Sequence, residues 1–331
     1  MSSDGSSVVT AESVPRPRRA VVAPFLRDYG MILVLVLLAG LLEIAQPRTL
    51  SPTNLLNLAR QVSITALIAA GETLVILSAN VDLSVGAVLT FAGVLSAGVL
   101  RDTGSPPLAI GIGLLAGAIA GLANGVFVAK GRLASFIVTL AVQGILAGTI
   151  LLYTNASPIP VNSAAFTSIG QGHVLGIPVP IVIAVLVYLT LWVVLSRTTL
   201  GRYIYAIGGN EEAARLAGVN VDRYKIAIFV LAGALSALSG IVLTSRLGSG
   251  VPTLGAGQEL IAITVVVLGG TSLFGGEGRI WGTLVGAAIL GLIGNGLNLL
   301  NVAPFYQSVV TGVVVLLAVL ADRLLRSAQE R

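Results

Sequence analysis

Residues 107–129 read PLAIGIGLLAGAIAGLANGVFVA and hold no Asp, Glu, Lys or Arg. A helix of this length extends about 34 Å at 1.5 Å per residue, enough to cross a hydrocarbon core of about 30 Å. The run lacks the strict apolar–polar alternation of a membrane β-strand. It therefore predicts a membrane-spanning helix.

The composition of the whole chain extends this interpretation. The chain has 331 residues, of which 55% are apolar and 10% are charged, against roughly 25% charged residues in soluble domains. Such a chain lacks the charge to cover a soluble surface or to remain disordered, which excludes soluble enzymes and nucleic-acid-binding proteins. The absence of Cys excludes disulfides and thiolate metal sites. We expect an all-α, polytopic helical membrane protein.

Apolar runs divide the chain into about ten candidate transmembrane helices. Residues 29–321 form the predicted transmembrane domain, between a disordered tail at 1–28 and a second tail at 322–331. The spans are 29–46, 58–78, 84–100, 107–129, 133–153, 177–196, 226–245, 257–275, 280–300 and 304–321. An even number of spans places both termini on the same side of the membrane.

The distribution of basic residues gives the orientation, because cytoplasmic loops of membrane proteins are enriched in Lys and Arg. With the N-terminus inside, the cytoplasmic segments hold Arg16, Arg18, Arg19, Arg27, Lys130, Arg132, Arg197, Arg202, Arg215, Arg223, Lys225, Arg279, Arg323, Arg326 and Arg331. The outer segments hold only Arg48, Arg60, Arg101 and Arg246. The net charge of +5 thus reflects an N-in/C-in topology rather than a nucleic-acid partner.

Glycines in the fourth span recur at every fourth position, at Gly113, Gly117, Gly121 and Gly125. A glycine face lets two helices approach closely in lipid, so it favours tight packing; a face that slides during gating is the alternative. Residues 121–125 (GLANG) also resemble 291–296 (GLIGNG) in the ninth span. The two spans run in opposite directions, which is typical of inverted repeats.

Glu72 lies inside the second span, where a charge costs at least about 2.5 kcal/mol. Two interpretations stay open. Glu72 is a hydrogen-bonded or protonated structural group, since no second carboxylate or Lys accompanies it at mid-span. Alternatively, it is the ion site of a secondary transporter for a small polar solute.

Five further polar residues are candidates for the substrate path. Asp82 and Ser84 either cap the third span or belong to a broken helix beside the path. Asn124, Asn295 and Asn298 lie within spans, where amides either bind a polyhydroxyl solute or link neighbouring helices.

The segment 197–225 is predicted to be a cytoplasmic loop that contains a short helix. Asn210 is its expected N-cap, and Gly218 its left-handed stop. Ala213, Leu216 and Ala217 share one face at i, i+3, i+4 spacing. Because so short a helix is marginal alone, we expect this face to dock onto a partner, with a helix resting on the membrane surface as the alternative.

The chain carries no motif for its own chemistry. It has no phosphate-binding G-x-x-x-x-G-K-[ST] sequence, no H-E-x-x-H and no G-x-S-x-G. We therefore predict no catalytic residues, no metal and no cofactor, and a transport subunit rather than an enzyme. Its energy must come from another chain or from an ion gradient.

Three motifs resemble a known family. They are DLSVG at 82–86, GNEEAARLAGV at 209–219, and GGTSLFGGEG at 269–278 followed by NGLNLL at 295–300. Their order and spacing, from about residue 55 to 321, are similar to those of the ribose/xylose-type permeases of bacterial ABC sugar importers. One departure is Ala79-Asn80-Val81, where the family usually has Gly-Gly-Ile; Asn80 tolerates the left-handed backbone expected there.

The resemblance implies a type II importer permease in the bacterial inner membrane. Two permease subunits, as a homodimer or with a paralogue, would form the pore for a monosaccharide. Two cytoplasmic ABC ATPase subunits would bind the ATP, and an extracytoplasmic sugar-binding protein would dock on the outer segment 154–176. The implied ATPase-coupling residues are Gly209, Asn210, Glu212, Ala213, Ala214, Leu216 and Gly218.

Overall fold

The computed structural model describes residues 19–303, 305–306, 309–310, 312–314, 316–317 and 320. The segment 1–18, the C-terminal tail at 322–331 and much of the predicted tenth span lie outside the described residues. The first helix begins at Arg19, so it includes the last part of the segment expected to be an N-terminal tail.

Helices dominate the described residues, with two short strand pairs between them. The helices are α1 (Arg19–Ala45), α2 (Pro52–Leu77), α3 (Val85–Thr103), α4 (Pro106–Ala129), α5 (Ser135–Thr154), α6 (Ala164–Gln171), α7 (Val179–Arg197), α8 (Thr199–Gly209), α9 (Glu211–Leu216), α10 (Val221–Leu247), α11 (Gln258–Leu268) and α12 (Ile280–Leu299). The strands are β1 (Ile159–Pro160), β2 (His173–Val174), β3 (Ile177–Pro178) and β4 (Ser249–Gly250). β1 pairs with β4 and β2 with β3, both antiparallel.

Seven of the described helices are long and apolar enough to cross a membrane, namely α2, α3, α4, α5, α7, α10 and α12. The apolar part of α1, Gly30–Ala45, and the whole of α11 are shorter. The prediction of a polytopic helical membrane protein is therefore confirmed. Each of the seven helices corresponds to one predicted span.

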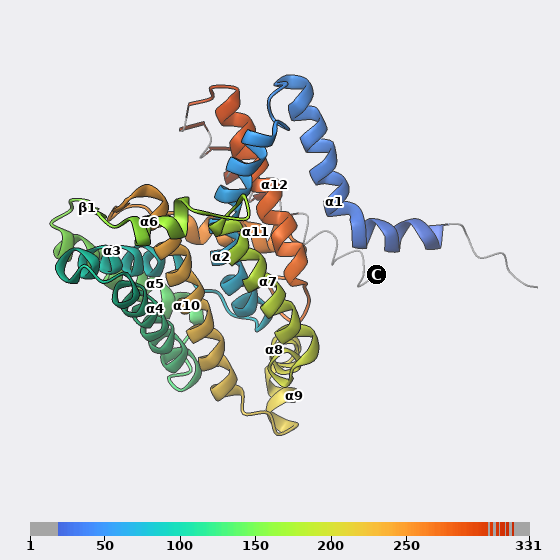
Figure 1. The fold of residues 1–331 in the computed structure, drawn as a ribbon. Helices are drawn as coiled ribbons and strands as arrows, with labels where there is room; N and C mark the ends of the chain where they lie inside the picture. Colours follow the sequence, from blue (N-terminus) through green and yellow to red (C-terminus); the bar gives the residue numbers. More distant parts are fainter. Residues whose placement is uncertain are drawn as a thin grey trace, which may run out of the picture.

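Helix α10 is central to the arrangement. It packs against α4, α3 and α2, and Figure 1 shows α3–α5 gathered on one side of it with α2, α11 and α12 on the other. We name the two ends of the molecule after the elements that lie beside each end of α10. The α9 end is where α10 begins, beside α8 and α9; the α6 end is where α10 finishes, beside α6 and the strands.

The glycine face of α4 packs as the sequence predicts. A Cβ atom on Gly117 or Gly121 would overlap the backbone carbonyl of Gly233 or of Phe229 on α10, and one on Gly113 would meet Ser96 on α3. Helices this close exchange dispersion contacts along their backbones, which is the main attraction between helices in lipid. The interpretation as a packing face is thus confirmed.

The prediction of a continuous helix over 257–275 is wrong. α11 ends at Leu268, seven residues early, because Gly269 and Gly270 follow it and Gly270 adopts a left-handed φ of 81°. The segment between Gly250 and α11 is not helical, and its Gly255 donates its N–H to Thr90 Oγ1 on α3 at 2.8 Å. Gly255 is the buried residue of this irregular segment, and a protein group satisfies its N–H.

Candidate functional site

The short helix α9 has the local chemistry that the sequence predicts. Asn210 is its N-cap, with the Ala213 N–H donating to Asn210 Oδ1 at 2.9 Å. Gly218 follows the helix with a φ of 85°, the left-handed conformation that stops a helix at low cost. Both predictions are confirmed, although α9 is only six residues long.

The predicted apolar face of α9 points into solvent. Leu216 is 84% exposed, and Ala213 and Ala217 beside it are also exposed. Ala214 differs from the other candidate coupling residues: it is buried against Ile207 and Val221 and anchors the helix. Gly209, Asn210, Glu212 and Gly218 are exposed around this face.

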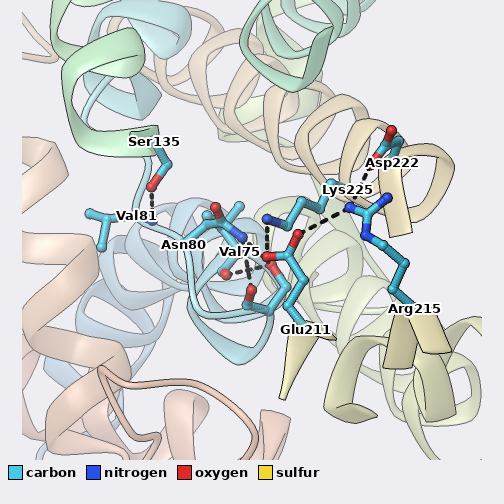
Figure 2. A network of polar contacts seen from close by, with 9 residues as sticks. Val75, Asn80, Val81, Ser135, Glu211, Arg215, Asp222 and Lys225 are labelled. Carbon is cyan, nitrogen blue, oxygen red and sulfur yellow. Dashed lines mark hydrogen bonds and ion pairs between the residues drawn. The ribbon is translucent and has the colours of Figure 1, made fainter. Parts of the chain in front are cut away.

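A network of ion pairs connects α9 to the start of α10 (Figure 2). Glu211 accepts from Lys225 at 2.6 Å and from Arg215 at 3.3 Å, and Arg215 also pairs with Asp222 at 2.9 Å. The Lys225 side chain is only 11% exposed and that of Glu211 is 44% exposed, so solvent screens the lysine end of this pair less than the glutamate end. Sequence reasoning missed the network; the i,i+4 spacing of Glu211 and Arg215 was the available signal.

These charges lower the pKa of Glu211. Partial burial raises the pKa, but the hydrogen bond and charge of Lys225, together with Arg215, hold it below its ordinary value. The carboxylate is therefore ionised at neutral pH and ties two separate elements together.

The α9 end is also in close contact with the membrane-spanning helices. Leu77 at the end of α2 accepts a backbone hydrogen bond from Gly276 at 3.0 Å, and Tyr205 on α8 donates to the Gly278 carbonyl at 3.0 Å. A Cβ atom on Gly208 would overlap the Leu77 carbonyl. The end of α8 therefore packs directly against the end of α2.

A cavity of about 750 Å³ opens between these elements. Its lining comes from the α2–α3 connection, the α4–α5 connection and the network itself, namely Ala79, Asn80, Val128, Ala129, Arg132, Leu133, Ala134, Ser135, Phe136, Glu211, Arg215 and Lys225. Figure 2 shows Asn80 next to Glu211, with the Val81 N–H donating to Ser135 Oγ at 3.1 Å. The left-handed residue of this connection is Ala79, with a φ of 58°, and not Asn80 as the sequence predicts.

Asp82, Ser84 and Asn124 form one polar cluster, in which each residue is at most 1% exposed. Asp82 Oδ1 accepts from the Ser84 N–H at 2.8 Å and from its hydroxyl at 2.6 Å, and Asn124 Nδ2 donates to Ser84 Oγ at 2.8 Å. Ser84 is the N-cap of α3 without a side-chain cap bond, so of the two predicted caps only Asp82 binds a backbone N–H there.

Glu72 joins the same cluster, which corrects the expectation that no second carboxylate accompanies it. Its Oε1 accepts from the Asp82 N–H at 3.2 Å, and both residues are buried. The chain turns back after α2, and this places Asp82 beside a residue more than one helical turn before the end of that helix. Spacing within one span does not reveal such a contact.

Asn295 lies elsewhere. It exchanges two amide hydrogen bonds with Asn54, at 2.8 and 3.0 Å, and so links α12 to the first turn of α2. Asn54 and Glu72 are 18 residues apart on α2, about 27 Å along the helix. Asn298 is exposed near the end of α12. The structure therefore brings together only three of the five predicted substrate-path residues.

Glu259 is a buried polar residue that the sequence analysis did not identify. It stands in the first turn of α11, where its Oε1 accepts from Gln143 Nε2 on α5 at 3.1 Å and from the Gly257 N–H at 3.3 Å. A carboxylate in the first turn of a helix is stabilised by the helix dipole. No group of three or more metal-ligating His, Cys, Asp or Glu side chains occurs among the residues described.

Comparisons with known proteins agree with this architecture. Residues 54–319 match the family model described as branched-chain amino acid transport system / permease component. The chain is 50% identical to the ribose import permease protein RbsC of Bacillus subtilis (strain 168) over 300 residues, covering 90% of this chain and 93% of the relative.

Two relatives of Escherichia coli (strain K12) extend the likeness. The chain is 38% identical to the D-allose transport system permease protein AlsC, over 92% of this chain and 94% of the relative. It is 40% identical to the L-arabinose transport system permease protein AraH, over 91% and 92%. No solved structure matches. The chain belongs to the permease-component family that this model describes, it is similar to ribose-type permeases of ABC sugar importers, and it is a multi-pass membrane protein.

Proposed function

We propose that this chain is the membrane permease subunit of an ATP-driven importer for a monosaccharide. One observation carries the proposal: a capped helix presents Leu216, 84% exposed, while ion pairs fix the helix to the central α10. An apolar side chain held in solvent by charges on its own helix is typical of a docking surface. The partner is an ABC ATPase that binds the ATP, because this sequence has no phosphate-binding loop of its own.

In this mechanism, closure of the ATPases on nucleotide moves α9. The pair Glu211–Lys225 transmits that movement to α10, and the contact of Gly208 with Leu77 transmits it to α2. Both helices pack on α3, which begins at the polar cluster of Asp82, Ser84 and Asn124. We propose that these three residues, with Asn295 and Asn298 at the other end of the path, contact the sugar once the buried cluster opens.

The membrane topology is part of the proposal. The chain crosses the bacterial cytoplasmic membrane ten times with both termini inside. The seven long helices provide seven crossings, and α1, α11 and the segment 304–321 provide the other three. The positions of basic residues support this orientation. Spans 1–5 and 6–10 are related as inverted repeats, as the likeness of 121–125 to 291–296 indicates. A second permease subunit completes the pore, and an extracytoplasmic sugar-binding protein delivers the solute at the α6 end.

The relatives supply the solute class. Their names specify ribose, D-allose and L-arabinose, so the solute proposed here is a monosaccharide. The alternative, an ion-coupled transporter that uses Glu72, gains no support from the relatives. One further relative, from Azospirillum brasilense, is named the L-arabinose ABC transporter permease protein AraH.

Co-purification tests the ATPase contact. The tagged permease is expressed with the ATPase of its transport system, and Leu216→Asp should abolish capture because it places a charge in the apolar contact. Glu212→Arg should weaken capture. Leu175→Asp is the matched control: Leu175 is 98% exposed but lies in the β2–β3 hairpin at the α6 end, so capture should persist.

Uptake tests the energy source and the solute. Vesicles that contain permease, ATPase and binding protein should accumulate labelled ribose with ATP inside, and a protonophore should not reduce the rate. If both Leu216→Asp and Glu212→Arg retain capture and ATP-driven uptake, α9 is not the coupling element. Uptake that ignores ATP and collapses with the protonophore would overturn the proposed function.

A further inference from the structure

Glu259 is a buried acidic residue that the proposed function does not use. The chain before it follows α3 inward from the α6 end, so that Gly250 lies against Ala97 and Gly255 binds Thr90. Ala97 and Thr90 are seven residues apart, about 10 Å along the helix. Glu259 therefore lies between the two ends of the molecule, at a depth where an ionisable side chain needs a partner or a function.

The two carboxylate oxygens of Glu259 have different surroundings. Oε1 accepts from Gln143 Nε2 on α5 at 3.1 Å and from the Gly257 N–H at 3.3 Å. Oε2 is buried beside Gly86 and accepts no hydrogen bond within the described part of the chain. A buried carboxylate oxygen without a donor costs free energy that a further donor would recover. Glu259 thus lacks at least one O–H or N–H partner.

The groups around Oε1 decide what kind of ligand would supply that partner. The Gln143 amide and the Gly257 N–H both present hydrogen atoms to the carboxylate, and donors of this kind repel a cation. A neutral solute with several hydroxyl groups fits instead. Two adjacent hydroxyls donate to the two oxygens of one carboxylate, and hydrogen bonds to an ionised acceptor are stronger than those between neutral groups.

Helix α5, which carries Gln143, has few contacts to hold it in place. It is the least buried of the seven long helices, and its extended contacts among the described residues are with α3 and α4 rather than with α11. Gly144 and Gly148 on α5 are exposed, and nothing lies within 4 Å of their Cβ positions. The first residue of α5, Ser135, lines the cavity beside Glu211. A movement at the α9 end can therefore reach α5 and separate Gln143 from α11.

We propose that Glu259 binds the hydroxyl groups of the sugar during transport and that Gln143 covers it in the present conformation. This inference rests on the proposed function, which supplies the monosaccharide and the movement at the α9 end. When α5 moves, Gln143 Nε2 leaves Oε1, and two adjacent hydroxyls of the sugar donate to the carboxylate. When the sugar leaves, Gln143 returns. Gly86, beside Oε2, is two residues after Ser84, so this site extends the path from the polar cluster.

An exchange of the two side chains separates sugar binding from structural support. Vesicles with permease, ATPase and binding protein are assayed for ATP-driven uptake of labelled D-ribose. Glu259→Gln keeps an oxygen acceptor for Gln143, so the melting temperature and ATPase capture should persist while uptake falls about tenfold or more. The double variant Gln143→Glu with Glu259→Gln restores a carboxylate–amide pair between the same helices. It should match the unaltered melting temperature and still transport poorly, because the carboxylate is then on the moving helix.

A chemical label tests access to the carboxylate without the need for uptake. Dicyclohexylcarbodiimide reacts with carboxyl groups in apolar surroundings, and mass spectrometry locates the labelled peptide. Gln143→Ala uncovers Glu259 and should speed its labelling, D-ribose should slow this labelling, and potassium chloride should not. Asp102→Asn is the matched control for uptake, because Asp102 is already paired with Arg101 at 2.7 Å. It should transport like the unaltered chain.

Three results would overturn the proposal. The first is normal uptake by Glu259→Gln. The second is full recovery of uptake in the exchanged double variant, which would show that the pair only joins α5 to α11. The third is labelling of Glu259 in Gln143→Ala that D-ribose does not slow. If the unaltered complex shows no ATP-driven uptake, the proposed function fails instead, and the labelling experiment still decides whether Glu259 binds a sugar.

Discussion

Glu72 shows how one buried residue acquires a structural role. Its Oε1 receives the Asp82 N–H, which would otherwise be a buried donor without a partner at the turn after α2. An unsatisfied buried donor costs about 1–3 kcal/mol. The residue thus fixes the turn that carries Asp82 and Ser84, whatever its protonation state.

This role makes a prediction that separates the acceptor from the charge. Glu72→Gln keeps an oxygen acceptor for Asp82, so we expect thermal stability and ATP-driven uptake close to those of the unaltered chain. Glu72→Leu removes the acceptor and should lower the free energy of unfolding by about 1–3 kcal/mol. Thermal melts in detergent measure both. Loss of uptake in a stable Glu72→Gln variant would show that the carboxyl group itself takes part in transport.

At the scale of elements, α4 and α10 share the most extensive helix–helix contact in the described part of the chain. Gly121 on α4 lies against the Phe229 carbonyl of α10, and Gly233 on α10 lies against the Gly117 carbonyl of α4. Neither helix can move sideways past the other without losing these backbone contacts. In the proposed mechanism the two helices therefore move together when α9 displaces the start of α10.

Replacing these glycines tests the packing. In Gly121→Ala the new methyl group would overlap a backbone carbonyl that has no rotamer to escape to, and overpacking of this kind costs about 1–3 kcal/mol. Gly111→Ala on the same helix is the control, since nothing lies within 4 Å of its Cβ position. We expect a lower melting temperature only for Gly121→Ala. Equal melting temperatures for the two variants would contradict close packing of α4 on α10.

The link between α9 and α10 should depend on pH through Glu211. Its folded-state pKa is lowered, so its contribution to stability is complete above the ordinary value near 4.3 and is lost as pH falls through the lower folded pKa. Because the chain has no native Cys, a spin label on Ala213→Cys reports this helix alone. The label should become mobile in acid. In a variant that also carries Glu211→Gln, the label should be mobile at all pH values. A label whose mobility ignores both changes would exclude the network as the link.

How much of this architecture the sequence predicts depends on the range of the contacts. The caps of α9 follow from Asn210 and Gly218, because capping involves residues three or four apart. The pair Glu211–Lys225 spans 14 residues and the contact of Glu72 with Asp82 reverses the chain direction, so neither has a periodic signature. The early end of α11 was missed because Leu273 and Phe274 were counted as part of the span, whereas Gly269 and Gly270 end the helix before them.

At the scale of the whole molecule, coupling and transport should separate when the network is altered. Glu211→Lys leaves Leu216 exposed but breaks the pair with Lys225, so we expect ATPase capture to persist while ribose uptake falls several-fold. The double variant Glu211→Lys with Lys225→Glu restores opposite charges and should recover part of the uptake. ATPase activity measured beside uptake identifies the uncoupled state. Normal uptake by the single variant would show that α9 moves α10 without this ion pair.

The shortness of α11 has a consequence for how the protein is made. Eleven residues form a helix of about 16 Å, roughly half of the hydrocarbon thickness. As it leaves the ribosome, such a segment is a poor independent substrate for insertion, because irregular backbone on either side would meet lipid with unpaired polar groups. Its native neighbours are α2, synthesised long before, and α12, synthesised just after. Biogenesis must therefore delay the insertion of α11 until α12 emerges, so that truncation before residue 280 should leave a chain that membrane quality control degrades.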